Sequence, residues 1–160
     1  GTKADIYEGG HHVPFFVRWP NKVKPDIKNN PICHTDFFST AADILSLEVK
    51  NEVEGEDSFS FLPLLKSQDG YQREPVIHHS ANGTFAIRKG DWKLILSNGS
   101  GGRQQPSSKP FVGEYQLYDL GTDIQESNNL ASENLAVVSE LLQDFDRMHG
   151  RTETLIDHKN

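Results

Sequence analysis

Apolar and polar positions divide the chain into a first part that mixes helix and strand and a later part of short strands followed by one helix. Residues 13–19 are apolar at nearly every position, which predicts a strand buried on both faces. Pro14 is compatible with this strand only at its beginning or at a sheet edge. Residues 35–47 carry apolar side chains at helical spacing, and Thr35 or Asp36 can cap that helix with a side-chain oxygen.

Residues 74–120 have the pattern of an antiparallel meander. Asn82 and Gly83 favour a tight turn because both residues accept a positive φ, and Gly90 marks a second turn. A loop rich in Gly, Ser and Pro precedes the last strand. The predicted strands are residues 75–80, 84–88, 92–96 and 115–120.

The last periodic segment predicts one helix over about residues 132–149, with Ser132 as its N-cap and Gly150 as its stop. Its apolar stripe consists of Leu135, Val138, Leu142, Phe145 and Met148. We therefore expect an α/β chain with a small antiparallel sheet of about four strands, packed by this C-terminal helix. The predicted divisions are residues 1–66, an α+β part at 67–150 and a polar tail at 151–160.

Composition argues against several classes of partner and structure. The 160 residues carry a net charge of −7 without any basic cluster, so we expect no nucleic-acid partner. No apolar run approaches the length of a membrane-spanning helix, and neither a membrane association nor a signal peptide is expected from this segment. Cys33 is the single cysteine, which excludes an internal disulfide.

Candidate chemistry is concentrated in histidines and in one lysine. The pairs His11-His12 and His78-His79 would point to opposite faces if they lie on strands, so that one ring of each pair can face a pocket. The alternative is that these are ordinary structural histidines. Lys3, beside a Gly-Gly turn, can hold an anion as a point charge, although a loop lysine is more often a plain surface residue. Glu8 is expected to fix the turn through backbone amides.

Five segments, in the same order along the chain, resemble motifs of the sulfatases. Residues 3–14 resemble K-x-x-x-x-E-G-G-x-R-x-P, with His12 in place of the arginine. The other four segments are residues 34–45, which resemble H-x-D-L-x-P-T-x-x-D-L; 56–65, which resemble D-G-x-S-x-x-P-L-L; 85–95, which resemble A-V-R-x-G-D-W-K-L-I; and 116–130, which resemble x-L-Y-D-L-x-x-D-P-G-E-x-x-N-L. Ser39 and Ser58 replace a proline and a glycine of these motifs. The chain is most similar to the bacterial arylsulfatase-like type.

The resemblance implies an alkaline-phosphatase-like fold and the hydrolysis of sulfate esters of aryl or carbohydrate compounds. Residues 1–66 would form the C-terminal edge of the large domain, and 67–150 the small C-terminal subdomain. Lys3 matches the lysine that contacts the substrate sulfate. His12, His78 and His79 would border the substrate cleft. Calcium and a formylglycine, made from a C/S-x-P-x-R motif, are expected in the full-length enzyme, whereas this chain carries neither a metal site nor that motif.

The resemblance also implies partners and leaves alternatives. We expect a missing N-terminal sulfatase half as companion, a sulfated small molecule or glycan as substrate, and self-association if the apolar residues 13–19 are left uncovered. The full-length enzyme would be periplasmic or secreted. A stand-alone module that binds sulfated glycans and a fragment of a related phosphoesterase or phosphonate hydrolase are the alternative functions.

Overall fold

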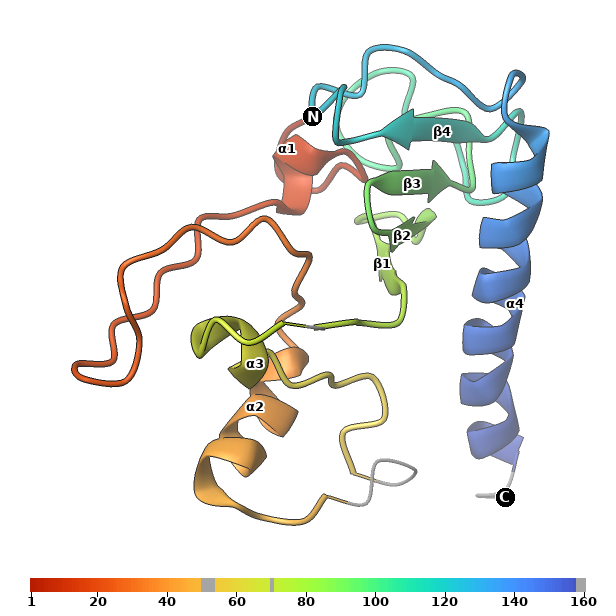
Figure 1. Ribbon diagram of the computed structural model, residues 1–160. Coiled ribbons are helices and arrows are strands. Elements are labelled where there is room, and N and C mark those ends of the chain that lie inside the picture. Colours follow the sequence, from red (N-terminus) through yellow and green to blue (C-terminus); the bar gives the residue numbers. More distant parts are fainter. Residues whose placement is uncertain (50–53, 70, 158–160) are drawn as a thin grey trace. The chain divides into compact units, whose positions relative to one another are not determined.

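The computed structural model describes residues 1–49, 54–69 and 71–157, and the side chains among them up to residue 150 (Figure 1). Contacts group the chain into two compact units. One comprises Gly1–Val13 with Ile77–Asn160, and the other comprises Pro14–Val76. The predicted boundary near residue 66 concerns the domains of a whole enzyme and stays a prediction.

The first unit is built on a four-stranded sheet in the order β1-β2-β3-β4. Strand β2 pairs antiparallel with β3, and β3 pairs antiparallel with β4. The predicted meander is thereby confirmed. The strands are β1 (Val76–His79), β2 (Phe85–Lys89), β3 (Trp92–Ile95) and β4 (Gln116–Asp119).

Both predicted turns of the meander are present. Gly83 has φ 85° and Gly90 has φ 59°, conformations that glycine adopts without a steric penalty. The Asn82 side-chain oxygen accepts hydrogen bonds from the Thr84 N–H at 3.1 Å and from the Ser80 hydroxyl at 3.0 Å. These hydrogen bonds hold the first turn closed. The Asn82 side chain therefore stabilises the turn that its sequence predicts.

Helix α4 (Leu135–Asp157) covers one face of the sheet, opposite the short helix α1 (Glu8–His11) (Figure 1). The apolar core between α4 and the sheet consists of Ile87, Leu94, Leu96, Leu117, Leu141 and Phe145. The predicted boundaries of this helix are wrong at both ends. It begins at Leu135, three residues after Ser132, and it continues past Gly150. An interior glycine costs a helix only about 1 kcal/mol, and no proline follows to end it.

The segment before Val13 covers the other face of the sheet. Ile6 is fully buried there, and the Tyr7 hydroxyl donates to the Gln116 side-chain oxygen at 2.9 Å. The second apolar core consists of Ile6, Ala86, Ile95, Tyr118 and Leu120. Residues 1–13 are therefore an integral layer of the first unit, although residues 14–76 separate them from the rest of that unit along the chain.

The predicted buried strand at residues 13–19 is wrong. This segment has no regular structure, and Val13 and Phe16 are 55% and 90% exposed. A strand needs a neighbour for its backbone N–H and C=O groups, and Pro14 contributes no N–H. Among the described residues no strand pairs with this segment. Its apolar pattern therefore lacks the partner that would turn it into a buried strand.

The second unit contains helix α2 (Asp36–Leu45) and the helical turn α3 (Leu62–Leu65). Helix α2 confirms the predicted helix, but the predicted cap is wrong, because neither Thr35 nor Asp36 caps the first turn. Asp36 is buried and instead accepts two hydrogen bonds from the Arg73 guanidinium at 2.9 and 2.8 Å. The Thr35 hydroxyl donates to the Asp57 carbonyl.

The predicted polar tail at 151–160 differs from the structure in part. Residues 151–157 belong to α4, and residues 158–160 lie outside the described part of the chain. The charged and polar residues of this segment are compatible with a helix because most of them have moderate helix propensity. Polarity alone therefore did not distinguish a tail from the end of a helix.

Candidate functional site

Lys3 lies in the turn at the start of the first unit. Ala4 has φ 91°, an uncommon value for a residue other than glycine, and the Asp5 N–H donates to the Thr2 carbonyl at 3.0 Å. The Lys3 side chain is exposed, and no hydrogen bond or ion pair joins its ammonium to the described part of the chain. This ammonium is therefore available to an anion from solvent.

The buried carboxylate of Asp5 holds the Lys3 turn in place through hydrogen bonds. Asp5 Oδ1 accepts from the N–H groups of Arg103 and Gln104 at 2.6 and 3.1 Å, and Oδ2 accepts from the Thr2 N–H at 2.6 Å. Burial alone would raise the pKa of Asp5, but these hydrogen bonds bring it below its ordinary value. Asp5 is therefore ionised at neutral pH and ties the Lys3 turn to the loop that follows β3.

Backbone contacts add to this attachment. The Ile6 N–H donates to the Ser100 carbonyl at 2.8 Å, and the Ala81 N–H donates to the Ala4 carbonyl at 3.0 Å. A side chain at Gly102 would collide with the Ala4 carbonyl oxygen, so the glycine allows the two loops to touch. The Gly-rich stretch of the sequence thus has a structural reason, because it lets a loop approach the Lys3 turn.

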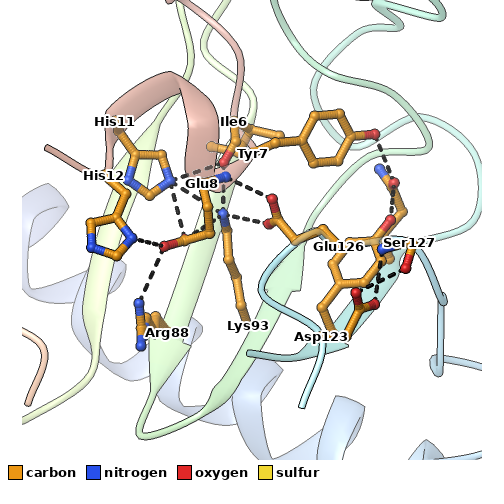
Figure 2. Close-up of polar contacts among 12 residues, drawn as sticks. Ile6, Tyr7, Glu8, His11, His12, Arg88, Lys93, Asp123, Glu126 and Ser127 are labelled. Atoms are coloured by element: carbon orange, nitrogen blue, oxygen red, sulfur yellow. Dashed lines mark hydrogen bonds and ion pairs between the residues drawn. The ribbon is translucent and has the colours of Figure 1, made fainter. Parts of the chain in front are cut away.

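Lys93, on β3, carries a fully buried ammonium beneath α1 (Figure 2). Its Nζ donates to Glu126 Oε1 at 2.7 Å, to the Ile6 carbonyl at 2.9 Å and to Glu8 Oε1 at 3.0 Å. His11 Nε2 lies 3.2 Å from the same nitrogen. An ammonium has three hydrogens, and the three oxygen acceptors use all of them. The buried charge is thus fully paired.

Glu8 links this buried group to the surface (Figure 2). Its Oε2 lies 3.4 Å from Arg88 Nη1 and 3.0 Å from His12 Nδ1, while its N–H donates to Glu126 Oε2 at 2.6 Å. Burial alone would raise the pKa of Glu8, but the charge and hydrogen bond of Lys93 bring it below the ordinary value. Two carboxylates and two cations therefore balance each other. We call Glu8, Arg88, Lys93 and Glu126 the charge cluster.

The rings of His11 and His78 lie against each other beside the charge cluster. Their ring centroids are 4.1 Å apart and their planes are tilted by 56°. Burial, followed by the charge of Lys93, lowers the pKa of His11 to about 4. Burial, followed by the charge of His11, lowers the pKa of His78 to about 3. Both rings are therefore neutral at neutral pH, and the buried His78 Nε2 has no hydrogen-bond partner among the described residues.

One of the two histidine pairs lies on a strand, as predicted, and the other does not. On β1, His78 turns toward His11 while His79 is exposed, as expected for neighbours on a strand, and His79 Nδ1 lies 2.9 Å from the Ser80 carbonyl. His11 and His12, by contrast, lie at the end of a helical turn and not on a strand. Both of these rings contact the Glu8 carboxylate.

Sequence reasoning missed most of the charge cluster. The expected role of Glu8 was wrong, since its carboxylate binds side chains and not backbone amides. Lys93 had one visible signal, because it interrupts the apolar run from Trp92 to Leu96 in a predicted strand. Its partners Glu8 and Glu126 are 85 and 33 residues away, and no local pattern connects them.

Two further features of the described residues concern cofactors and membranes. No group of three or more His, Cys, Asp or Glu side chains among them is arranged to hold a metal ion. Within the same part of the chain, no helix has the length and apolar character needed to cross a membrane.

The C-terminal family model of N-sulphoglucosamine sulphohydrolase matches residues 2–151. The chain belongs to the sulfatase family. An N-acetylgalactosamine-6-O-sulfatase from Bacteroides thetaiotaomicron is 35% identical over 153 residues, which cover 88% of this chain and 28% of the relative. Arylsulfatase K from Gallus gallus is 30% identical over 141 residues, which cover 81% of this chain and 24% of the relative.

A solved structure from work on the metabolism of multiple glycosaminoglycans by Bacteroides thetaiotaomicron superimposes with a TM-score of 0.77. It is 32% identical, and the match covers 94% of this chain and 31% of the other. The predicted fold class, the C-terminal part of the alkaline-phosphatase-like sulfatase fold, is confirmed. The chain thus spans less than a third of the length of each of these sulfatases.

Replacing Lys93 tests how much the charge cluster contributes to the free energy of unfolding. Lys93→Met leaves the buried carboxylates of Glu8 and Glu126 without their shared cation, so we expect the free energy of unfolding to fall by about 3–5 kcal/mol or folding to fail. Lys89→Met is the matched control, because Lys89 pairs with carboxylates on the exposed surface, and we expect less than about 1 kcal/mol. Urea unfolding followed by circular dichroism measures both, and equal losses would contradict the account.

His11 and His78 predict a loss of stability in mild acid. Their pKa values of about 4 and about 3 in the folded chain lie below the ordinary 6.5. At pH values between the folded and the ordinary pKa, the unfolded chain therefore binds more protons than the folded chain. Their stabilising contribution is complete above pH 6.5 and is lost as the pH falls toward the folded values. Near pH 5.5, each ring adds a slope of up to about 1.4 kcal/mol per pH unit.

We expect His78→Phe to reduce this slope by about half, because it keeps an aromatic ring against His11 but removes one titrating group. His34→Ala removes an exposed histidine of the other unit and should leave the slope unchanged. The measurement is urea unfolding at a series of pH values between about 7 and 5. A stability independent of pH in this window would contradict the assignment.

Proposed function

We propose that the chain is the C-terminal part of an enzyme that hydrolyses sulfate esters, with a sulfated carbohydrate as its substrate and an aryl sulfate as a model substrate. The observation that carries the proposal is the exposed Lys3 ammonium on a turn held in place by buried contacts. The relative named N-acetylgalactosamine-6-O-sulfatase and the glycosaminoglycan context of the similar structure support a carbohydrate substrate.

Lys3 would contact the sulfate group. Hydrolysis of a sulfate ester concentrates negative charge on the sulfate oxygens, and a preorganised cation stabilises that charge without having to reorganise during the reaction. The Asp5 carboxylate and the backbone bonds of the turn supply the preorganisation. The ammonium itself stays unpaired toward the described part of the chain, so its charge is not neutralised before the substrate binds.

His12, His78 and His79 would contribute to the rim of the substrate cleft. The exposed side chains of His12 and His79 can reach a ligand directly. His78 lies against His11, and its Nε2 is buried, so we propose that it shapes the rim by supporting the His11 ring. All three rings belong to the same unit as Lys3.

The remaining parts of the machinery would lie outside this chain. The described residues do not fit a metal site, and the sequence has no C/S-x-P-x-R motif, so calcium and formylglycine would be held by the N-terminal portion of the enzyme. We propose that residues 1–66 belong to the edge of its large domain. The exposed apolar residues of the second unit, which include Phe16 and Ile27 at 90% and 86% exposure, are suited to packing against that portion. Without it, the chain would self-associate.

A periplasmic or secreted location goes with this proposal. The alternatives of a stand-alone glycan-binding module and of a phosphoesterase or phosphonate hydrolase fragment have less support, because the named relatives are sulfatases.

The test is Lys3→Ala in the full-length enzyme that contains this chain. We expect kcat/KM for a sulfated sugar and for nitrophenyl sulfate to fall by about 10²–10³-fold, the usual effect of removing one preorganised charge or donor. Lys22→Ala, which removes an exposed lysine of a different loop, is the matched control and should retain activity. The isolated 160-residue chain should show no turnover. An unchanged kcat/KM in Lys3→Ala, or hydrolysis by the isolated chain, would overturn the proposal.

A further inference from the structure

His12 is an exposed imidazole held by a buried carboxylate (Figure 2). The His12 side chain is 60% exposed and that of Glu8 is 6% exposed, and His12 Nδ1 lies 3.0 Å from Glu8 Oε2. The His12 N–H donates to the Glu8 carbonyl at 2.8 Å and closes the helical turn of α1. This places the two side chains four residues apart on one helical face, where they can meet.

The contact fixes which nitrogen of the ring carries the proton. Glu8 is ionised, because Lys93 and Arg88 lie against its two oxygens, and an ionised carboxylate can only accept hydrogen bonds. Nδ1 of His12 must therefore be the protonated nitrogen. In the neutral ring Nε2 then carries the lone pair, and it lies on the side of the ring away from Glu8.

The charges of the charge cluster next to this ring are balanced. Glu8, the partner of His12, contacts His11 of α1, Arg88 of β2 and Lys93 of β3. Beyond these, Glu126 after β4 pairs with Lys93, and the neutral His78 of β1 lies against the neutral His11. The two carboxylates offset the two cations. A lone pair at Nε2 repels the oxygens of a sulfate group and attracts a hydroxyl group, which can donate a hydrogen bond.

We propose that Glu8 is a positioning residue that sets the tautomer of His12, so that His12 Nε2 accepts a hydrogen bond from a ring hydroxyl of the sugar substrate. This inference deepens the proposed function and rests on it. Two residues of the segment 3–12 then have different roles. Lys3 binds the sulfate group, and His12 recognises the sugar that carries it. His12 thereby determines specificity and takes no part in the sulfate chemistry.

The first test needs only the 160-residue chain. Two-dimensional nitrogen–proton correlation spectra through multiple bonds distinguish a protonated from an unprotonated ring nitrogen. For the neutral ring we expect His12 to have a protonated Nδ1 and an unprotonated Nε2. A His12 ring with the proton on Nε2, or with protons on both nitrogens, would overturn the proposal.

Two variants separate the positioning role from folding. Glu8→Gln offers His12 an amide that can donate as well as accept, so the Nδ1–H form should lose its dominance. Glu126→Gln alters the same cluster around Lys93 but not the contact with His12, so the His12 tautomer should stay as in the wild type. An unchanged tautomer in a folded Glu8→Gln variant would contradict the role of Glu8. The wild-type spectrum remains decisive should that variant fail to fold.

The second test uses the full-length enzyme and sulfated sugar substrates that each lack one ring hydroxyl. For the wild type, loss of the recognised hydroxyl should lower kcat/KM by about tenfold, since His12 Nε2 is left without its donor. His12→Ala should lower kcat/KM for the complete sugar and become insensitive to that hydroxyl. His34→Ala, which removes an exposed histidine of the second unit, should keep the wild-type sensitivity.

Equal sensitivity of the wild type and His12→Ala to every hydroxyl would overturn the proposal even if the tautomer is as expected. Failure of the proposed function itself gives a different result. In that case the full-length wild type does not hydrolyse sulfated sugars, Lys3→Ala is as active as the wild type, or the isolated chain is itself active, whereas the nitrogen–proton spectra of the isolated chain still report the His12 tautomer.

Discussion

A single buried cation, the ammonium of Lys93, determines how the first unit is assembled. A charge withdrawn from water is tolerated only when it is paired and hydrogen-bonded, and strand β3 cannot supply those partners itself. Glu8 comes from the start of the chain, and Glu126 comes from the loop after β4. The ammonium therefore joins three distant parts of the sequence, and the segment that carries Lys3 must stay on the sheet for the charge to be satisfied.

The pairing of Glu8 with Lys93 also positions the exposed residues that precede and follow Glu8 in the sequence. Toward the N-terminus, Ile6 is part of the second apolar core, and Asp5 ties the turn to the loop after β3. The Lys3 turn is therefore held in place although its ammonium has no partner in the described part of the chain. Toward the C-terminus, the same carboxylate orients His12. The strong charges of this region are thus paired below the surface, and the side chains of Lys3 and His12 are exposed above it.

The regular elements were predictable because their signals are local. The strands follow from alternating apolar positions, and the turn at Asn82 and Gly83 follows from residues that accept unusual backbone angles. The failures occurred where a local signal depended on a distant partner. Residues 13–19 read as a buried strand, but a strand exists only beside another. Gly150 failed for a different, local reason, because a helix can continue past a glycine at a small cost. Motifs singled out Lys3 and His12 as candidate site residues, and these assignments stay predictions. Asp5, Lys93 and Glu126 were not singled out, because long-range pairing of charges leaves no spacing to detect.

Amide hydrogen exchange on the 160-residue chain tests most directly whether the charge cluster locks the Lys3 segment to the sheet. The Ile6 N–H, bonded to the Ser100 carbonyl, and the His12 N–H, bonded to the Glu8 carbonyl, report on the two sides of Glu8. The account predicts that both exchange about as slowly as the amides of β3, because opening them requires breaking the Lys93 pairs. Exchange of these two amides as fast as in the exposed loop at residues 24–30, with β2 and β3 still protected, would contradict it.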